Sequence, residues 1–177
     1  VDTSIVLKDR SASIVQQQYA WIDVFPLDGM PNNQIKLKIH SFRLLLARMI
    51  FNYSIFSSGV DMNAKNRPWY EKVLIRFGQV LPVEKIFNRQ KAYIRLDRLL
   101  KMYDFDESNY LINLMGAYKL KEMFHKKYFG NGAKYEFEGM QLNGPKDYNY
   151  VLTQLYGDYM TPPPIGDRNH HRIEIVK

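Results

Sequence analysis

The hydrophobic pattern divides the chain into an extended first part and a longer helical part. Short runs of β-branched and aromatic residues predict strands at 4–8, 11–16 and 20–25, and Pro26 ends the third of them. Residues 27–33 are rich in turn-forming side chains. We therefore expect residues 1–30 to supply the strands of a sheet.

Residues 34–103 show the spacing of amphipathic helices. A long helix is predicted over 34–56, where apolar residues recur at steps of three and four: Ile39, Phe42, Leu46, Met49, Tyr53 and Phe56. His40 and Arg43 are expected on its wetter face. Pro68 is suited to the start of a second helix, and Pro82 to the start of a third over about 83–103.

The remaining pattern predicts smaller elements. Residues 110–114 are ambiguous, and 118–125 are expected to form a short helix. A hairpin is predicted around Glu138-Gly139, followed by a helix over 146–156 with Gly157 as its C-cap, and residues 161–177 are expected to form an extended tail. This order predicts an α+β fold in a single domain, 1–177: a short mixed sheet covered by several helices, with a hairpin and helix within 117–160.

Composition narrows the classes of function. The 177 residues contain no cysteine and carry a net charge of +7. A disulfide framework, a thiolate zinc site and a cysteine nucleophile are therefore excluded for this sequence. The longest uncharged stretches are 11–22 and 49–60, well short of the roughly 20 apolar residues of a membrane-spanning helix.

Asp23 is the most unusual carboxylate in the sequence. It lies within the apolar run Trp21-Ile22-Asp23-Val24-Phe25, where a charged group is costly unless donors or a cation satisfy it. Two interpretations stay open: a carboxylate hydrogen-bonded at a strand end, or a metal ligand on a rigid strand.

Four separated segments resemble the LicD (fukutin-related) family, in the order of that family. They are Lys8-Asp9-Arg10; Trp21-Ile22-Asp23-Val24-Phe25-Pro26-Leu27-Asp28-Gly29; Tyr128-Phe129-Gly130-Asn131-Gly132 with Phe137-Glu138-Gly139; and Leu155-Tyr156-Gly157-Asp158-Tyr159-Met160 with Pro162-Pro163 and His170. The resemblance implies a nucleotidyltransferase-like fold that transfers a phospho-alcohol, such as phosphocholine, from a CDP-linked donor. The acceptor would be a sugar hydroxyl of a cell-surface glycan such as lipopolysaccharide or teichoic acid.

The resemblance also implies roles for individual residues. Asp23 would be the catalytic residue and a ligand of Mg²⁺ or Mn²⁺. The substrate-binding candidates are Lys8, Arg10, Asp28, Glu138, Asp158 and His170. Lys8 and Arg10 have an alternative interpretation as ordinary surface charges, Asp28 as a cap of the following turn, and His170 as part of a surface tail. The family's upstream Asp-rich segment does not occur in this sequence, so we expect this chain to hold only part of the metal site.

Two basic clusters indicate an anionic partner or a solvated face. One comprises Lys85, Arg89, Lys91, Arg95, Arg98 and Lys101, and the other Lys119, Lys121, Lys126 and Lys127. No recognition motif for nucleic acid accompanies them, so nucleic acid is not an expected partner. A CDP donor, a phosphate-rich glycan or the inner face of the membrane are the alternatives, and a cytoplasmic location is expected.

Two further groups of residues bear on function. Asp104-Phe105-Asp106 has the spacing of a carboxylate pair but is expected to be a solvated loop. The aromatic residues of 148–159 could stack a sugar or a base, or pack in the core. The alternative to an enzyme is a non-catalytic module that binds an anionic glycan or a partner protein through the basic face.

Overall fold

The computed structural model describes residues 2–9, 16–20, 22–59, 68–162, 164–165 and 173–175. The chain divides into two compact units. The first unit is Val1–Val24, Ile50–Ala92 and Pro162–Lys177, and the second unit is Phe25–Met49 and Tyr93–Thr161. The boundaries fall inside two helices, α1 (Gln34–Ser54) and α5 (Arg89–Leu100), and each unit is described by itself.

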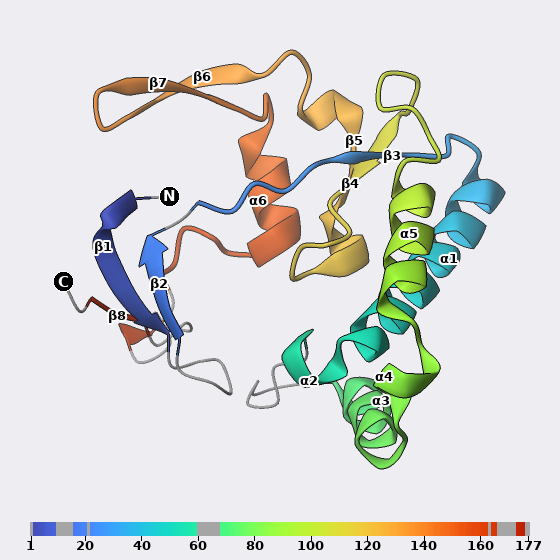
Figure 1. Ribbon diagram of the computed structural model, residues 1–177. Helices are drawn as coiled ribbons and strands as arrows, with labels where there is room; N and C mark the ends of the chain where they lie inside the picture. Colours follow the sequence, from blue (N-terminus) through green and yellow to red (C-terminus); the bar gives the residue numbers. More distant parts are fainter. Residues whose placement is uncertain are drawn as a thin grey trace. The chain divides into compact units, whose positions relative to one another are not determined.

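The first unit contains a three-stranded antiparallel sheet (Figure 1). Its order is β2 (Gln16–Ala20), β1 (Asp2–Asp9) and β8 (Ile173–Ile175). The predicted strand at 4–8 is confirmed as part of β1. The predicted strand at 11–16 lies outside the described residues except for Gln16, where β2 begins. Within the predicted extended tail, Ile173–Ile175 pairs with Leu7–Asp9.

The helices of the first unit pack around the ring of Tyr53. These helices are α2 (Phe56–Gly59), α3 (Trp69–Val80) and α4 (Val83–Ile86). The Tyr53 ring stacks on Phe87 at 6.0 Å between centroids, and its hydroxyl donates to the Leu74 carbonyl at 3.0 Å. Gly78 faces the Phe56 ring so closely that a Cβ at this position would overlap the ring. This helix contact therefore requires a residue without a side chain.

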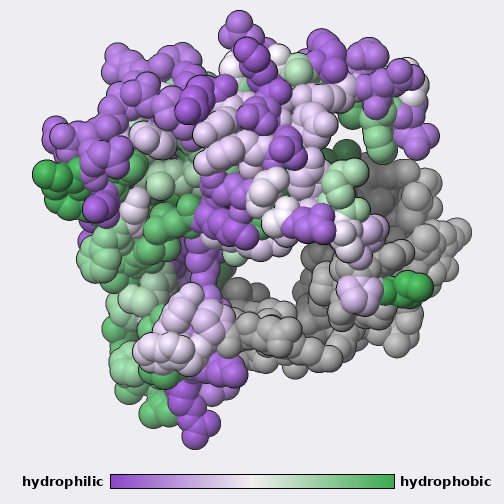
Figure 2. Space-filling model, turned by 180° about the vertical axis from the view of Figure 1, so that it is seen from behind, coloured by the Kyte–Doolittle hydropathy of each residue, from purple (hydrophilic) through white to green (hydrophobic). Residues whose placement is uncertain are grey.

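Much of the apolar surface of α3 is exposed. Pro68 stands at its N-cap, one residue before the predicted position. Trp69, Phe77 and Val80 are 76%, 52% and 72% exposed. Figure 2 shows apolar side chains on the surface among the helices.

The second unit is built on another three-stranded antiparallel sheet, in which β4 (Tyr110–Ile112) lies between β3 (Asp28–Met30) and β5 (Met123–His125). The predicted strand over 20–25 is wrong for residues 22–25, because residues 22–27 have no regular structure and Ile22 and Val24 are 89% and 87% exposed. The propensity of such residues for strands reflects packing against neighbouring strands. Among the described residues, none pairs with 22–27, and β3 forms in the predicted turn instead.

Helices α1 and α5 complete the core of the second unit. Asn33 accepts from the backbone N–H of Ile35 and Lys36 at 3.0 and 3.1 Å, which starts α1 at its predicted position. Asn88 accepts from the N–H of Lys91 at 3.0 Å, and this cap divides the single helix predicted over 83–103 into α4 and α5.

The buried face of α1 differs from the prediction at its first turns. Leu37, His40 and Leu44 are buried, whereas Ile39 and Phe42 are 56% and 67% exposed. The sequence predicts His40 on the wetter face, but this residue is only 1% exposed, in edge contact with the Tyr103 ring at 4.8 Å. Helical periodicity locates an apolar stripe, but the sheet and α5 decide which stripe is covered.

The second unit ends in a C-terminal module, by which we mean residues 126–161. It contains the 3₁₀ turn η2 (Lys126–Tyr128), the hairpin β6 (Ala133–Phe137) and β7 (Met140–Gly144), and α6 (Tyr148–Tyr156). The hairpin and α6 confirm the prediction, with Asp147 accepting from Tyr150 at the N-cap and Gly157 at the C-cap. The helix predicted over 118–125 is wrong: a 3₁₀ turn, η1 (Lys119–Glu122), leads into β5, because Met123–His125 pairs with β4.

The α+β class is confirmed, with a difference in the sheet. All described strand pairs are antiparallel, and they form two small sheets and a hairpin rather than one short mixed sheet. None of the helices in the described ranges combines the length and apolar character needed to cross a bilayer.

His40 is predicted to make the stability of the protein depend on pH. Its burial, and secondarily Arg43, lower its pKa below the usual 6.5, while the Leu99 carbonyl opposes this. Neither ring nitrogen has a hydrogen bond of good geometry among the described residues. Below about pH 6.5 the histidine of the unfolded chain binds a proton, whereas buried His40 of the folded chain resists protonation. The free energy of unfolding therefore decreases as the pH is lowered, by at most about 1.4 kcal/mol per pH unit.

The substitution His40→Leu should remove this decline, as measured by urea unfolding between pH 5 and pH 8. It should cost little stability at pH 8, because it also removes buried polar atoms that lack partners. His125→Leu, at another histidine of the same unit, serves as the control and should keep the decline. An equal decline in His40→Leu and the unsubstituted chain would show that His40 is not its source.

Candidate functional site

Asp23 is exposed in the irregular segment 22–27. The expectation that Asp23 lies on a rigid strand is therefore wrong, for the reason given above: no described strand pairs with this segment. Its side chain has no hydrogen-bond or ion-pair partner within the described ranges, which also leaves the alternative of a carboxylate held at a strand end without support. The carboxylate is accessible to a ligand.

Asp28 lies at the start of β3 in a small cluster of charges. It is half-buried, and Asp97 and Lys101 from the α5 side are its charged neighbours. Burial raises the pKa of Asp28 above the usual 3.8, Asp97 raises it further, and Lys101 lowers it. Lys101 is bound more tightly to Asp97, with Nζ 2.8 Å from Oδ1. Asp28 lies in β3, where a turn was predicted, and the helix that follows is capped by Asn33.

A carboxylate with a raised pKa is a common property of functional sites, although structural charge networks produce it as well. In this cluster, Lys101 can neutralise only part of the charge of two neighbouring carboxylates. A bound cation, or a hydrogen-bond donor on a ligand, would therefore stabilise the ionised form of Asp28.

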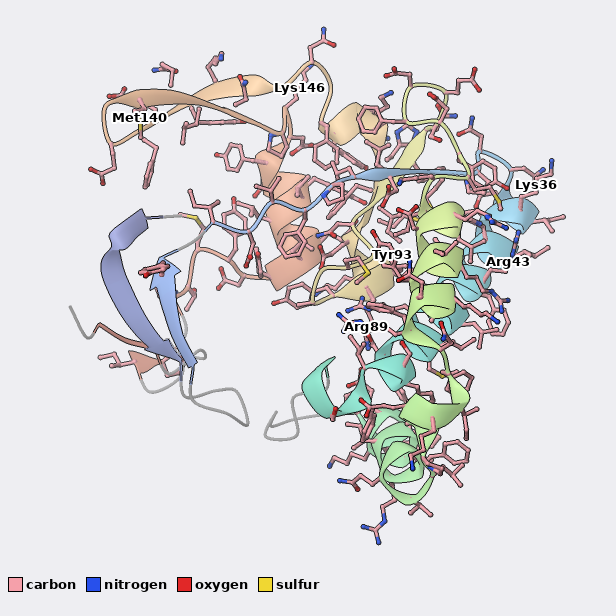
Figure 3. All side chains as sticks on the ribbon, viewed as in Figure 1. Lys36, Arg43, Arg89, Tyr93, Met140 and Lys146 are labelled. Atoms are coloured by element: carbon pink, nitrogen blue, oxygen red, sulfur yellow. The ribbon has the colours of Figure 1, made fainter. Side chains whose placement is uncertain are left out.

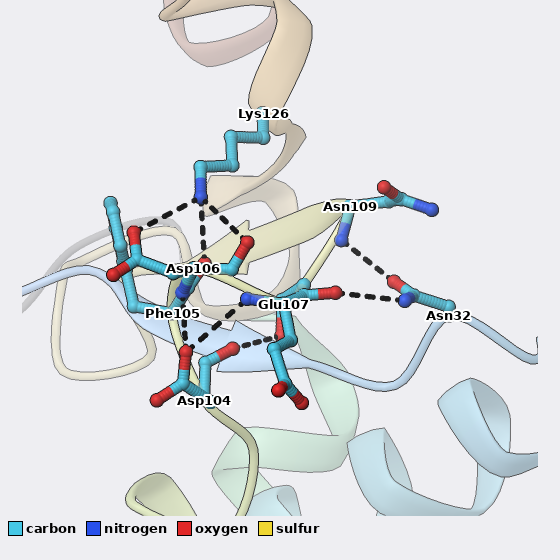
Figure 4. Close-up of polar contacts among 8 residues, drawn as sticks. Asn32, Asp104, Phe105, Asp106, Glu107, Asn109 and Lys126 are labelled. Atoms are coloured by element: carbon cyan, nitrogen blue, oxygen red, sulfur yellow. Dashed lines mark hydrogen bonds and ion pairs between the residues drawn. The ribbon is translucent and has the colours of Figure 1, made fainter.

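The acidic loop at 104–108 is organised by its own hydrogen bonds (Figure 4). The Asp104 carboxylate accepts from the backbone N–H of Asp106 and Glu107 at 2.7 and 3.2 Å. Lys126 Nζ donates to the carbonyls of Phe105 and Asp106 at 2.9 and 3.2 Å. The Asp104 carboxylate closes the turn, so Asp104 and Asp106 do not form a carboxylate pair, as expected from the sequence.

The segments that carry the family resemblance in the second unit form turns that need glycine. Gly130, Gly132, Gly139 and Gly157 have φ angles of 53°, 77°, 74° and 73°. Such angles are costly for residues with a Cβ. The turns of the C-terminal module therefore explain why glycine occurs at these positions.

The polar candidates of this module are both exposed. Glu138 lies at the hairpin turn with φ of 50°, and Asp158 accepts from the Thr161 hydroxyl at 2.6 Å. Lys8 lies in β1, and Arg10 and His170 lie outside the described residues. Within the described part of the second unit, no hydrogen bond or ion pair joins Asp28, Glu138 and Asp158 to one another.

A cavity of about 270 Å³ lies in the C-terminal module. Its lining is apolar: Tyr135, Pro145, Tyr148, Val151 and Leu152. The hairpin contributes Tyr135, and α6 contributes Tyr148, Val151 and Leu152. Figure 3 labels Met140 on the hairpin and Lys146 near the start of α6. The aromatic content of 148–159 indicated stacking residues, but not which of them would surround a cavity.

The two basic clusters differ in whether their side chains have hydrogen-bond partners. In the second cluster, Lys121 donates to the Leu155 carbonyl at 2.6 Å and Lys126 holds the acidic loop. On α5, by contrast, Lys91, Arg95 and Arg98 are exposed and have no partner within the described ranges. Their spacing of four and three residues puts them on one face of the helix, which we call the basic stripe.

The described residues do not by themselves fit a complete metal site. No group of three His, Asp or Glu side chains within the described ranges is close enough to hold a metal ion. Mg²⁺ is usually held by more than one oxygen ligand of protein and substrate, so Asp23 alone would bind it weakly.

Comparison with curated proteins finds a partial match. A stretch of 54 residues is 43% identical to the lipopolysaccharide cholinephosphotransferase LicD of Haemophilus influenzae. It covers 30% of this chain and only 20% of that protein. No family model and no solved structure matches the chain. The match supports a relation between this stretch of the chain and LicD.

Asp28→Asn is predicted to raise the melting temperature at pH 7. Because the pKa of folded Asp28 is raised, the free energy of unfolding falls as the pH rises from the usual 3.8 through the pKa of the folded state, and asparagine removes this cost. At pH 3, below the usual 3.8, the carboxyl is protonated in both states and the gain should be much smaller. Asp158→Asn, at an exposed carboxylate with a hydroxyl donor, is the control and should give no gain. A loss of stability in Asp28→Asn at pH 7 would contradict the assignment.

Proposed function

We propose that this chain takes part in the transfer of phosphocholine, or of a similar phospho-alcohol, from a CDP-linked donor to a sugar hydroxyl of a cell-surface glycan. The observation that carries this proposal is the 43% identity over 54 residues to a protein named as a lipopolysaccharide cholinephosphotransferase. We place the reaction in the cytoplasm or at the inner face of the membrane, where a nucleotide-linked donor would be available.

The reaction replaces the phosphoanhydride bond of the CDP-linked donor with a phosphate ester to the acceptor. The acceptor hydroxyl oxygen attacks the phosphorus that carries the alcohol, the bond from this phosphorus to the oxygen of CMP breaks, and CMP leaves. The hydroxyl proton must go to a base as the new bond forms. Charge develops on the phosphoryl oxygens, and cationic groups stabilise it.

The chain offers residues for two of these tasks. Asp23 is an accessible carboxylate that can accept the proton of the acceptor hydroxyl, and we propose it as one ligand of Mg²⁺ or Mn²⁺ together with groups beyond the described residues. The basic stripe offers three cations for the donor phosphates or for an anionic glycan.

A non-catalytic module is the second candidate. The basic stripe favours it, because three cations on one helix face, without partners in the described ranges, would attract an anionic glycan without any chemistry. The two candidates differ in turnover: an enzyme releases CMP, and a binding module does not.

Asp23→Asn is predicted to abolish most turnover. In the natural gene product that carries this sequence, CMP release from CDP-choline in the presence of lipopolysaccharide should fall by about 100-fold or more, because the amide cannot accept the proton. Asp106→Asn, at an exposed carboxylate of the acidic loop, should retain activity. Unchanged turnover in Asp23→Asn would refute its catalytic role, and absence of turnover in the unsubstituted protein would favour the binding module.

The basic stripe is predicted to bind the anionic substrate. The triple variant Lys91→Gln, Arg95→Gln and Arg98→Gln should bind CDP-choline about 10-fold more weakly by isothermal titration, since each exposed ion pair is worth up to about 1 kcal/mol. The affinity of the unsubstituted chain should also fall with added salt. The control Lys36→Gln, Lys38→Gln and Lys134→Gln removes the same number of charges from other exposed positions. Equal loss in both triple variants would show that only net charge matters.

A further inference from the structure

Two tyrosine rings form a right-angled corner in the cavity of the C-terminal module. The rings of Tyr135 and Tyr148 have centroids 5.4 Å apart and an interplanar angle of 84°. Pro145, Val151 and Leu152 complete the lining. A ligand in this corner would meet ring faces and aliphatic carbon.

The corner is rigid on the Tyr135 side. The Tyr135 hydroxyl donates to the Pro145 carbonyl at 2.8 Å, which keeps it occupied within the module. Gly144 lies under the same ring, where a Cβ would be 2.8 Å from it. The ring is thus held by a hydrogen bond and by packing before any ligand arrives, and this lowers the entropy cost of binding.

The lining selects for one kind of cation. A primary ammonium has three N–H donors that lose water on burial, and an apolar wall gives them no acceptors. A quaternary ammonium has no N–H groups, carries its charge on methyl surfaces and is attracted by aromatic faces within about 6 Å of the ring centroid. A sugar or a nucleobase would leave its own polar groups unpaired against this wall.

We propose that this cavity binds the trimethylammonium head group of a choline-containing donor. The inference rests on the proposed function and narrows its donor to choline over ethanolamine, glycerol or ribitol. The word cholinephosphotransferase in the name of the partially matching protein agrees with this choice. The hairpin and α6, with the glycine turns around them, then have a role as the head-group site.

The test measures free head groups, so that it does not depend on nucleotide binding. Phosphocholine and phosphoethanolamine are titrated into the isotopically labelled 177-residue chain, and amide chemical shifts are followed along α6. Phosphocholine should bind more tightly than phosphoethanolamine by at least about 3-fold, with the largest shifts at Tyr148–Tyr156 and at Tyr135.

Variants at Tyr148 separate the aromatic face from simple bulk. Tyr148→Leu keeps an apolar wall but removes the ring, and should weaken phosphocholine by about 3- to 30-fold. Tyr148→Phe keeps the ring face and should bind as the unsubstituted chain does. Tyr156→Leu is the matched control, since Tyr156 is an exposed tyrosine of the same helix that does not line the cavity. Tyr148 is 48% exposed, so we expect these variants to fold, which circular dichroism checks.

The outcomes distinguish this inference from the proposed function. Equal affinity for the two head groups, unchanged affinity in Tyr148→Leu, or no shifts in α6 would overturn the head-group site. The donor itself is tested with CDP: a chain that binds CDP but shows no preference for phosphocholine retains the transferase proposal and loses this one. Conversely, selective phosphocholine binding without CDP binding supports the pocket and counts against the CDP-linked donor.

Discussion

The second unit depends on the close approach of β3 to the loop that follows α5. At Gly29 a Cβ would lie 2.6 Å from the carbonyl oxygens of Tyr103 and Asp104, so only glycine allows this contact without a shift. Asn32 ties the same loop from the other side, by accepting from the N–H of Asn109 and donating to the Glu107 carbonyl. A strand of only three residues is thereby held in register, and α1 begins four residues beyond it.

The same contact explains the charge cluster at Asp28. Because β3 is pressed against the end of α5, the residue before Gly29 comes close to Asp97 and Lys101. Lys101 is already paired with Asp97, so its positive charge only partly stabilises the ionised carboxylate of Asp28. The tertiary contact thus creates an ionisable group that costs stability. Such a cost is typical of functional positions, and Asp28 lies in one of the segments that resemble the LicD family.

In the C-terminal module, the residues that resemble the LicD family have a structural role. Gly130, Gly132, Gly139 and Gly157 adopt positive φ angles. The Tyr128 carbonyl accepts from the Asp147 N–H at 2.8 Å, and the Tyr128 ring stacks on Tyr150 with centroids 3.6 Å apart. These contacts hold the start of α6 against η2, and the Tyr135 hydroxyl, which donates to the Pro145 carbonyl, links the hairpin to the segment before α6. The residues that resemble the family thus build the module, while the residues that would touch a ligand in the cavity lie between them.

The sequence by itself determined the elements whose signals are local. Asn33 starts α1, Glu138-Gly139 turns the hairpin, and Asp147 with Gly157 bounds α6, because a cap or turn needs only its immediate neighbours. Only the tertiary structure decided that residues 22–27 have no partner strand among the described residues, that His40 is buried, and that Tyr135 meets Tyr148. The physical reason is that a hydrophobic pattern tells which residues favour burial, whereas the surface that covers them comes from segments far away in the chain.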